Sequence, residues 1–156
     1  MTPPPAAPLA PIRYRVDLAD AARHLIAIAA TFPTEGAPSI ELTMAVWTPG
    51  SYLVREFSRH VESVTAESAA GIALRVEKTA KNRWRVATGG ALMVIVSYRV
   101  YGREMSVRTN WIESDFAFVN GAPTFLTLAG PSTALGASES ARPHEVSIVP
   151  AIAGGR

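Results

Sequence analysis

Short runs of alternating apolar and polar residues, separated by turn-forming residues, constrain the fold of this chain more than any other feature. Because successive side chains of a β-strand point to opposite faces, such alternation predicts strands with one buried face. The clearest run covers residues 92–101, and its second face is also partly apolar, so we expect this strand to be central in a sheet. Similar runs occupy residues 12–18, 24–32, 40–46, 62–70, 72–77, 83–86 and 145–149. The sequence therefore predicts an all-β fold, either an antiparallel β-sandwich or a curved, saddle-like sheet, with little or no helix.

The sequence divides into a leader, one domain and a tail. Residues 1–11 carry five prolines and no charge, and proline opposes both helix and sheet pairing, so we expect an extended leader or linker. Residues 12–150 are expected to form a single all-β domain, with residues 130–143 as a mobile loop, because the segment is rich in Ser, Ala, Gly and Pro. Residues 151–156 are expected to be a flexible tail.

Composition excludes several classes of function. Apolar residues make up 48% of the chain and charged residues 18%, which allows a substantial core. The net charge is only +2 and the arginines are scattered, so we expect no nucleic-acid partner. There is no cysteine for a disulfide or a thiolate metal site. No signal peptide or membrane-spanning run is recognisable, so a cytoplasmic protein is expected, or a periplasmic one if a signal has been removed.

Residues 47–61, with the sequence WTPGSYLVREFSRHV, are the most distinctive stretch and are called the corner below. Proline presets φ and glycine accepts the positive φ that follows, so Pro49-Gly50 predicts a type II turn after the strand at residues 40–46. The residues that define this structural signature are Trp47, Pro49, Gly50, Ser51, Tyr52, Arg55, Phe57, Arg59 and His60.

The corner admits structural and functional interpretations. Arg55 and Arg59 beside His60 could clamp a substrate carboxylate, but we favour a role in bonding loop carbonyls or an acid such as Glu56, Glu62 or Asp115. Ser51 or Ser58 near His60 is the one candidate for a serine nucleophile, and turn-shaping hydrogen bonds explain both serines more simply. Trp47, Trp84 and Tyr98 are interpreted first as core residues.

No catalytic or metal-binding site is predicted. A zinc peptidase helix needs two histidines four residues apart with a glutamate beside the first. His144-Glu145 supplies only the first half of that pattern, because Ile148 stands where the second histidine is required. The local alternation there predicts a strand.

The region after residue 102 has a looser pattern. A strand is expected at residues 106–109, followed by an apolar run at residues 116–119. Asn120-Gly121 then favours a type I′ hairpin, with residues 124–128 as the returning strand.

The corner closely resembles the signature of the N-terminal domain of the glycyl aminopeptidase family of zinc metallopeptidases. Further elements of that family appear in order as residues 81–86, 94–101, 106–108 and 118–125. The resemblance covers residues 12–150. It implies an all-β domain that precedes a thermolysin-like catalytic domain, and the zinc and the hydrolytic residues would belong to that catalytic domain rather than to this chain.

On this resemblance the chain is expected to be a non-catalytic domain that packs on the catalytic domain and helps to shape the substrate cleft. It implies that Asn120 and Gly121 approach the cleft, with a plain hairpin turn as the alternative interpretation. The alternative function is a self-standing peptide- or carbohydrate-binding module that uses the corner or Trp111 as its platform. A domain separated from its neighbour should expose an apolar patch, through which it could form a homodimer.

Overall fold

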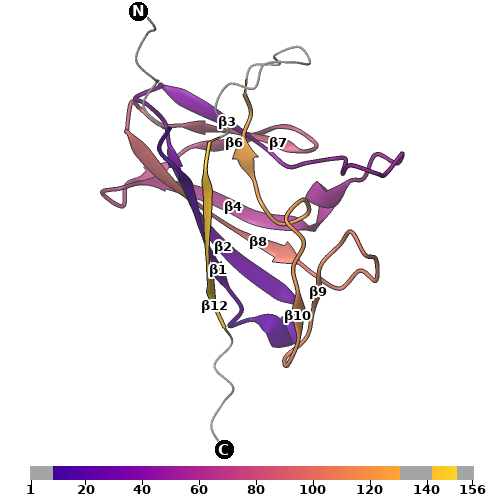
Figure 1. Cartoon of the computed structure of the whole chain (residues 1–156). Helices are drawn as coiled ribbons and strands as arrows, with labels where there is room; N and C mark the ends of the chain where they lie inside the picture. The colour runs from indigo at the N-terminus through magenta and orange to yellow at the C-terminus, as the bar shows by residue number, and fades with distance from the viewer. Residues whose placement is uncertain (1–8, 131–141, 151–156) are drawn as a thin grey trace, which may run out of the picture.

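The computed structural model describes residues 9–130 and 142–150, and its architecture is all-β, as predicted (Figure 1). Most of the predicted leader, most of the predicted loop and all of the predicted tail lie outside these residues. Two short 3₁₀ helices, η1 (Ala21–Arg23) and η2 (Phe57–His60), interrupt the strands. The strands are β1 (Ile12–Asp17), β2 (Leu25–Pro33), β3 (Ser39–Thr43), β4 (Val61–Ser68), β5 (Ala73–Leu74), β6 (Val76–Ala80), β7 (Arg83–Ala87), β8 (Met93–Tyr101), β9 (Trp111–Ile112), β10 (Ala117–Phe118), β11 (Thr127–Leu128) and β12 (His144–Val149).

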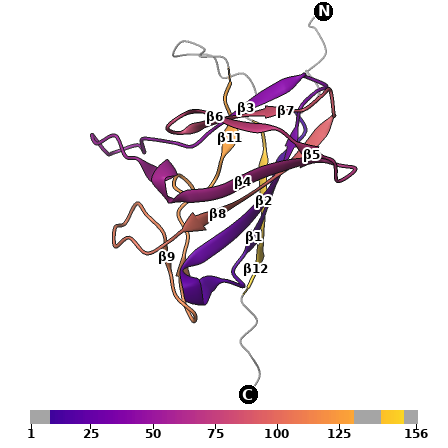
Figure 2. The same ribbon diagram turned by 180° about the vertical axis from the view of Figure 1, so that it is seen from behind.

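The strands form a six-stranded sheet in the order β12-β1-β2-β8-β4-β5, a four-stranded sheet in the order β11-β3-β7-β6, and a small pair, β10-β9. β8 lies between β2 and β4, which confirms its predicted central position. The turned view of Figure 2 shows the four-stranded sheet at one end of the larger sheet. Within residues 9–130 and 142–150, no helix is long and apolar enough to cross a membrane.

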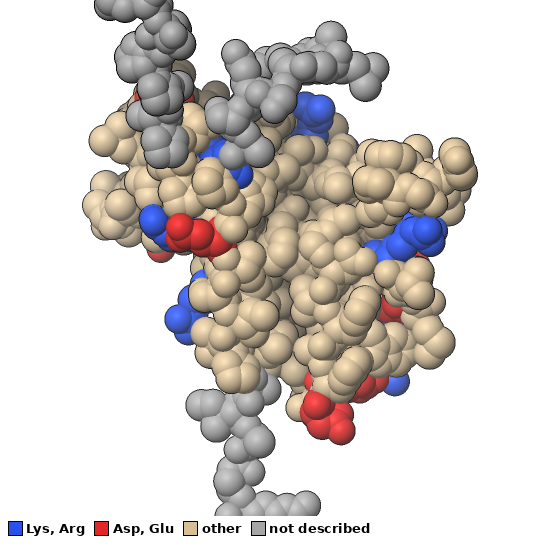
Figure 3. All heavy atoms as spheres, in the orientation of Figure 1, with Lys and Arg blue, Asp and Glu red and all other residues tan. Residues whose placement is uncertain are grey.

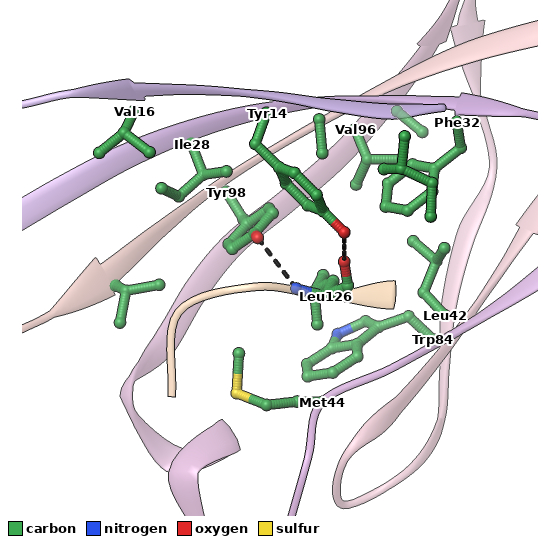
Figure 4. Packing of buried hydrophobic residues seen from close by; sticks show 14 of the residues in the cluster. Tyr14, Val16, Ile28, Phe32, Leu42, Met44, Trp84, Val96, Tyr98 and Leu126 are labelled. Atoms are coloured by element: carbon green, nitrogen blue, oxygen red, sulfur yellow. Dashed lines mark hydrogen bonds between the residues drawn. The ribbon is translucent and has the colours of Figure 1, made fainter. Parts of the chain in front are cut away.

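The hydrophobic core lies between the two larger sheets, and the segment that leads to β11 crosses it (Figure 4). Alternate residues of β1, β2 and β8 face this core, as the sequence pattern predicts. The hydroxyl of Tyr14 donates to the Leu126 carbonyl at 2.8 Å, while the hydroxyl of Tyr98 donates to the Thr124 carbonyl at 2.9 Å and accepts the Leu126 N–H at 3.1 Å. Burial is the main reason that the pKa of Tyr14 rises to about 12, and it also raises the pKa of Tyr98. These two hydroxyls satisfy the backbone hydrogen-bonding groups of Thr124 and Leu126, which lie before β11 and are not paired with a strand.

Three expectations about local structure are wrong. β12 pairs in parallel with β1, so the larger sheet is not purely antiparallel. The alternating run at residues 72–77 is divided between β5 and β6, which belong to different sheets. Residues 106–109 form a turn rather than a strand, in which the Thr109 N–H donates to the Ser106 carbonyl at 3.3 Å.

The predicted type I′ hairpin at Asn120-Gly121 is also wrong. Neither residue has the positive φ that such a turn requires. β10 pairs with β9, and β11 pairs with β3, so the residues on either side of the turn do not pair with each other. The cause is a competing set of bonds, because the N–H groups of Thr124 and Phe125 both donate to the Gly121 carbonyl, at 3.1 and 3.0 Å, and form a helix-like turn.

Candidate docking site

The first half of the corner is an exposed projection that follows β3 (Figure 1). The Ser51 N–H donates to the Thr48 carbonyl at 3.1 Å and Gly50 has a φ of 80°, which is the geometry of a type II turn. The Trp47 indole donates to the Ser51 carbonyl and closes the loop. Trp47 itself is 52% exposed, so its assignment to the core is wrong, whereas Trp84 and Tyr98 are buried as predicted.

The second half of the corner is anchored by η2. Phe57 and Ser58 are buried, and Phe57 belongs to the core cluster. Arg59 and His60 follow them and direct their polar groups away from the core, toward the loop that connects β8 to β9. This loop, residues 102–110, is called the connecting loop below.

Glu104 of the connecting loop is the acid that the corner binds. The Arg59 Nη2 donates to one carboxylate oxygen at 3.0 Å, and the His60 Nε2 lies 2.9 Å from the other. Because a carboxylate can only accept, the Nε2 of His60 carries a hydrogen, and the 3.2 Å approach of the Arg59 Nε to the same nitrogen is then a contact rather than a hydrogen bond. The bond to His60, followed by that to Arg59, lowers the pKa of Glu104.

A second cluster holds the other side of the connecting loop. The His24 Nδ1 lies 2.6 Å from the Ile112 carbonyl and must donate to it, so the Nε2 accepts from the Arg103 Nη1 at 2.9 Å. Arg103 also lies 3.5 Å from Glu113 and stacks over Trp111 at 5.7 Å. The connecting loop is therefore held by polar side chains from both directions.

Asn120 is hydrogen-bonded to the same loop. Its backbone N–H donates to the Asn110 side chain at 2.7 Å, and its side-chain amide donates to the Val107 carbonyl at 3.3 Å. A Cβ on Gly121 would come only into ordinary contact with Phe125, at 3.7 Å. The Asn120-Gly121 turn thus lies beside the connecting loop, and its approach to a substrate cleft stays a prediction.

The remaining sequence candidates are not brought together into a reactive site. Ser51 and Ser58 are both buried, and no hydrogen bond joins either of them to His60 in the described part of the chain. Of the acids proposed as partners for the corner, Glu56 binds Lys81 and Glu62 binds Arg99, each at 2.9 Å. Glu104 was missed because it lies 44 residues from His60 and its sequence context carries no signal of that contact.

The described residues do not fit a zinc site. No three His, Cys, Asp or Glu side chains come close enough together in residues 9–130 and 142–150 to hold a metal ion. His144 and Glu145 lie on the exposed edge strand β12 rather than on a helix. The zinc that the resemblance implies therefore finds no ligand set in the described part of this chain.

The corner, the connecting loop and Phe118 of β10 together present an apolar surface. Tyr52 is fully exposed, and the other large apolar side chains of this surface are at least 44% exposed. These side chains are Trp47, Tyr52, Leu53, Val54, Met105, Val107 and Phe118. In the orientation of Figure 1, the projecting part of this surface carries no charged side chain, and basic groups lie next to it (Figure 3). Patches of this kind mark interaction sites on otherwise polar proteins.

Two hollows accompany the apolar surface. One, of about 540 Å³, is bordered by Met105, Val107, Trp111 and Phe118. The other, of about 300 Å³, lies between the corner and the connecting loop and is called the corner groove below. Its lining residues are Leu53, Val54, Arg55, Glu56, Phe57, Arg59, His60, Glu104 and Thr109.

Comparisons with known proteins identify related domains. The model of the peptidase M61 N-terminal domain family matches residues 13–151. The crystal structure of an aminopeptidase N family protein from Idiomarina loihiensis is similar to this chain, with 30% sequence identity and a TM-score of 0.77. That match covers 90% of this chain but only 22% of the other. No curated protein matches the sequence.

Proposed function

This chain belongs to the family of peptidase M61 N-terminal domains, and from that premise we propose that it is a non-catalytic domain that packs on a catalytic domain through its apolar surface and helps to shape the substrate cleft. The observation that carries the proposal is the concentration of exposed apolar side chains on the corner and the connecting loop. An interface of this kind within one chain buries roughly 600–1,500 Å² and resembles a protein–protein contact. The match to 22% of the Idiomarina chain leaves ample polypeptide in that relative to supply such a neighbour.

Trp111 and Trp47, the expected platforms of a self-standing binding module, do not favour that function over domain docking. A ligand-binding groove would combine apolar walls with convergent polar groups. The hollow beside Trp111 is bordered mainly by Met105, Val107 and Phe118, and Trp111 is already stacked against Arg103. Trp47 is exposed, but its indole N–H is used within the corner.

The docking proposal is tested in a chimera in which this chain replaces the matched domain of the Idiomarina protein. A docked domain should unfold together with the remainder, in one calorimetric transition. The double variant Leu53→Asp/Val107→Asp places charges in the proposed interface and should split the unfolding into two transitions. The matched control is Ile72→Asp/Leu92→Asp, because these exposed apolar residues lie beyond the opposite ends of β4 and β8.

A chimera that unfolds in two transitions before any substitution would contradict the proposal. So would equal effects of the two double variants. For the isolated chain we expect no hydrolysis of glycyl or alanyl p-nitroanilides, with or without added zinc. Chelator-sensitive hydrolysis by the purified 156-residue chain would overturn its non-catalytic assignment.

A further inference from the structure

Arg55 lines the corner groove, and its charge is not matched by any carboxylate among the described residues. Its Nε is buried and has no hydrogen-bond partner, and among the described residues no carboxylate forms an ion pair with its guanidinium. Only its backbone N–H is bonded, to the Val46 carbonyl at 2.7 Å. A buried donor without a partner is costly, so its retention at the wall of a hollow points to a partner from outside.

The acids that line the corner groove are already committed. Glu104 is bound by Arg59 and His60, and Glu56 is bound by Lys81. These pairs leave the guanidinium of Arg55 as a surplus positive charge in the groove. Arg85 also lacks an ion pair among the described residues, but its side chain is exposed to water, whereas Arg55 is half-buried.

The walls of the groove specify the kind of anion that fits. Leu53, Val54 and Phe57 contribute apolar surface beside the guanidinium. Phosphate or sulfate would leave these walls in contact with strongly hydrated oxygens. A carboxylate on an aliphatic stem suits both features, because the planar guanidinium pairs with it through two parallel hydrogen bonds while the stem contacts the apolar wall.

We propose that Arg55 receives an aspartate or glutamate side chain of the neighbouring domain, set within an otherwise apolar docking surface. This inference rests on the proposed function and specifies the chemistry of the partner. The neighbouring domain is favoured over a small ligand because exposed Leu53 and Val54 line the groove, and the connecting loop that forms its other side carries the exposed Met105 and Val107. Together they suit a broad surface with one buried acid at its centre.

The preference of Arg55 for a carboxylate on an aliphatic stem is tested on the 156-residue chain by ¹H–¹⁵N NMR of the arginine Nε–H groups. The probes are N-acetyl-L-leucine, which carries an aliphatic group and a carboxylate, and N-acetyl-L-leucinamide, which lacks the charge. We expect the Arg55 signal, assigned from its loss in Arg55→Lys, to shift in a saturable way with the acid and at least about tenfold more weakly with the amide. In Arg55→Gln, the groove-lining backbone signals should lose their response to the acid, and in Arg55→Lys they should keep part of it. Arg85→Gln should respond like the wild type.

The chimera separates this inference from the docking itself. Arg55→Gln should uncouple the two unfolding transitions in the chimera, and Arg85→Gln should not. If Leu53→Asp/Val107→Asp uncouples the domains but Arg55→Gln leaves them coupled, the docking stands and the acidic partner is overturned. Equal responses of the isolated chain to the acid and the amide would also overturn it. If neither variant affects coupling, the docking proposal itself fails.

Discussion

At the scale of single residues, Glu104 links the second half of the corner to the connecting loop. One carboxylate receives the donors of Arg59 and His60, which are adjacent in sequence, and so ties η2 to a loop 44 residues away. The sequence predicted that the arginines of the corner would bond loop carbonyls or an acid such as Glu56, Glu62 or Asp115. It could not identify the acid, because the pairing depends on how β8 and β4 bring two distant loops to the same end of a sheet.

Substituting Glu104→Gln should destabilise the protein at neutral pH but not in acid. The pKa of Glu104 is lowered from 4.5 in the folded state, so its contribution is present above that value and is lost as the pH falls through the folded pKa. Its side chain is 39% exposed and therefore screened by solvent, so we expect a loss of about 0.5–1 kcal/mol at pH 7. Thermal unfolding at pH 7 should show the difference from the wild type, and the difference should shrink and then vanish as the pH is lowered from 4.5 through the folded pKa of Glu104.

The control for this prediction is Glu77→Gln, which removes an exposed acid that lies 4.0 Å from Arg75. We expect its unfolding to match the wild type at both pH values. A Glu104→Gln defect that persists unchanged in acid would show that the carboxylate acts through its shape rather than its charge.

Gly102 starts the connecting loop and is required for its close approach to β9. An added Cβ would lie 2.7 Å from the Ile112 Cγ1 and 3.0 Å from the Asn110 Cβ, both near the backbone of buried residues. Gly102→Ala should therefore cost about 1–3 kcal/mol of unfolding free energy in urea titrations. Gly130→Ala is the matched control and should be neutral, because a Cβ there would meet no atom of the described residues within 4 Å.

At the scale of elements, alternation predicted strands well but not their partners. β1, β2 and β8 alternate cleanly because one face packs on the core and the other does not. Periodicity says nothing of which edge a strand joins, so the parallel pairing of β12 with β1 could not be expected. The predicted Asn-Gly hairpin failed for a related reason. Local preference was overridden because the Asn120 N–H donates to the Asn110 side-chain oxygen and the Asn110 amide donates to the Thr124 hydroxyl.

The segment before β11 is held to the larger sheet by tyrosine hydroxyls, so Tyr98→Phe should loosen it. The substitution leaves the Thr124 carbonyl and the Leu126 N–H without their partner in a buried site. We expect a loss of about 1–3 kcal/mol in global stability. Faster amide hydrogen exchange at Leu126 than at β2 would place the loss in this segment. Tyr101→Phe, at an exposed position, is the control.

At the scale of the whole molecule, the two ends of the larger sheet are different surfaces. The apolar end combines the corner, the connecting loop and β10, which come from three separate parts of the sequence. The corner was recognisable in sequence as a distinct motif. Met105 and Val107 of the connecting loop and Phe118 of β10 were not recognised as exposed, because an apolar residue is normally expected to turn inward and nothing local shows that these three do not.

If this apolar end is a docking face left without its neighbour, the isolated chain should associate through it. Burial of apolar surface is worth about 25 cal/mol per Å², so a patch of this kind should give measurable dimerisation at high protein concentration. Sedimentation velocity of Leu53→Ser/Val107→Ser should then show at least about tenfold weaker association, which corresponds to about 1.4 kcal/mol. The double variant Ile72→Ser/Leu92→Ser removes comparable exposed apolar groups from the opposite end and should associate like the wild type. Equal weakening by both would mean that association follows overall apolarity rather than this face, and a wild-type chain that stays monomeric at millimolar concentration would show that the face is well solvated without a partner.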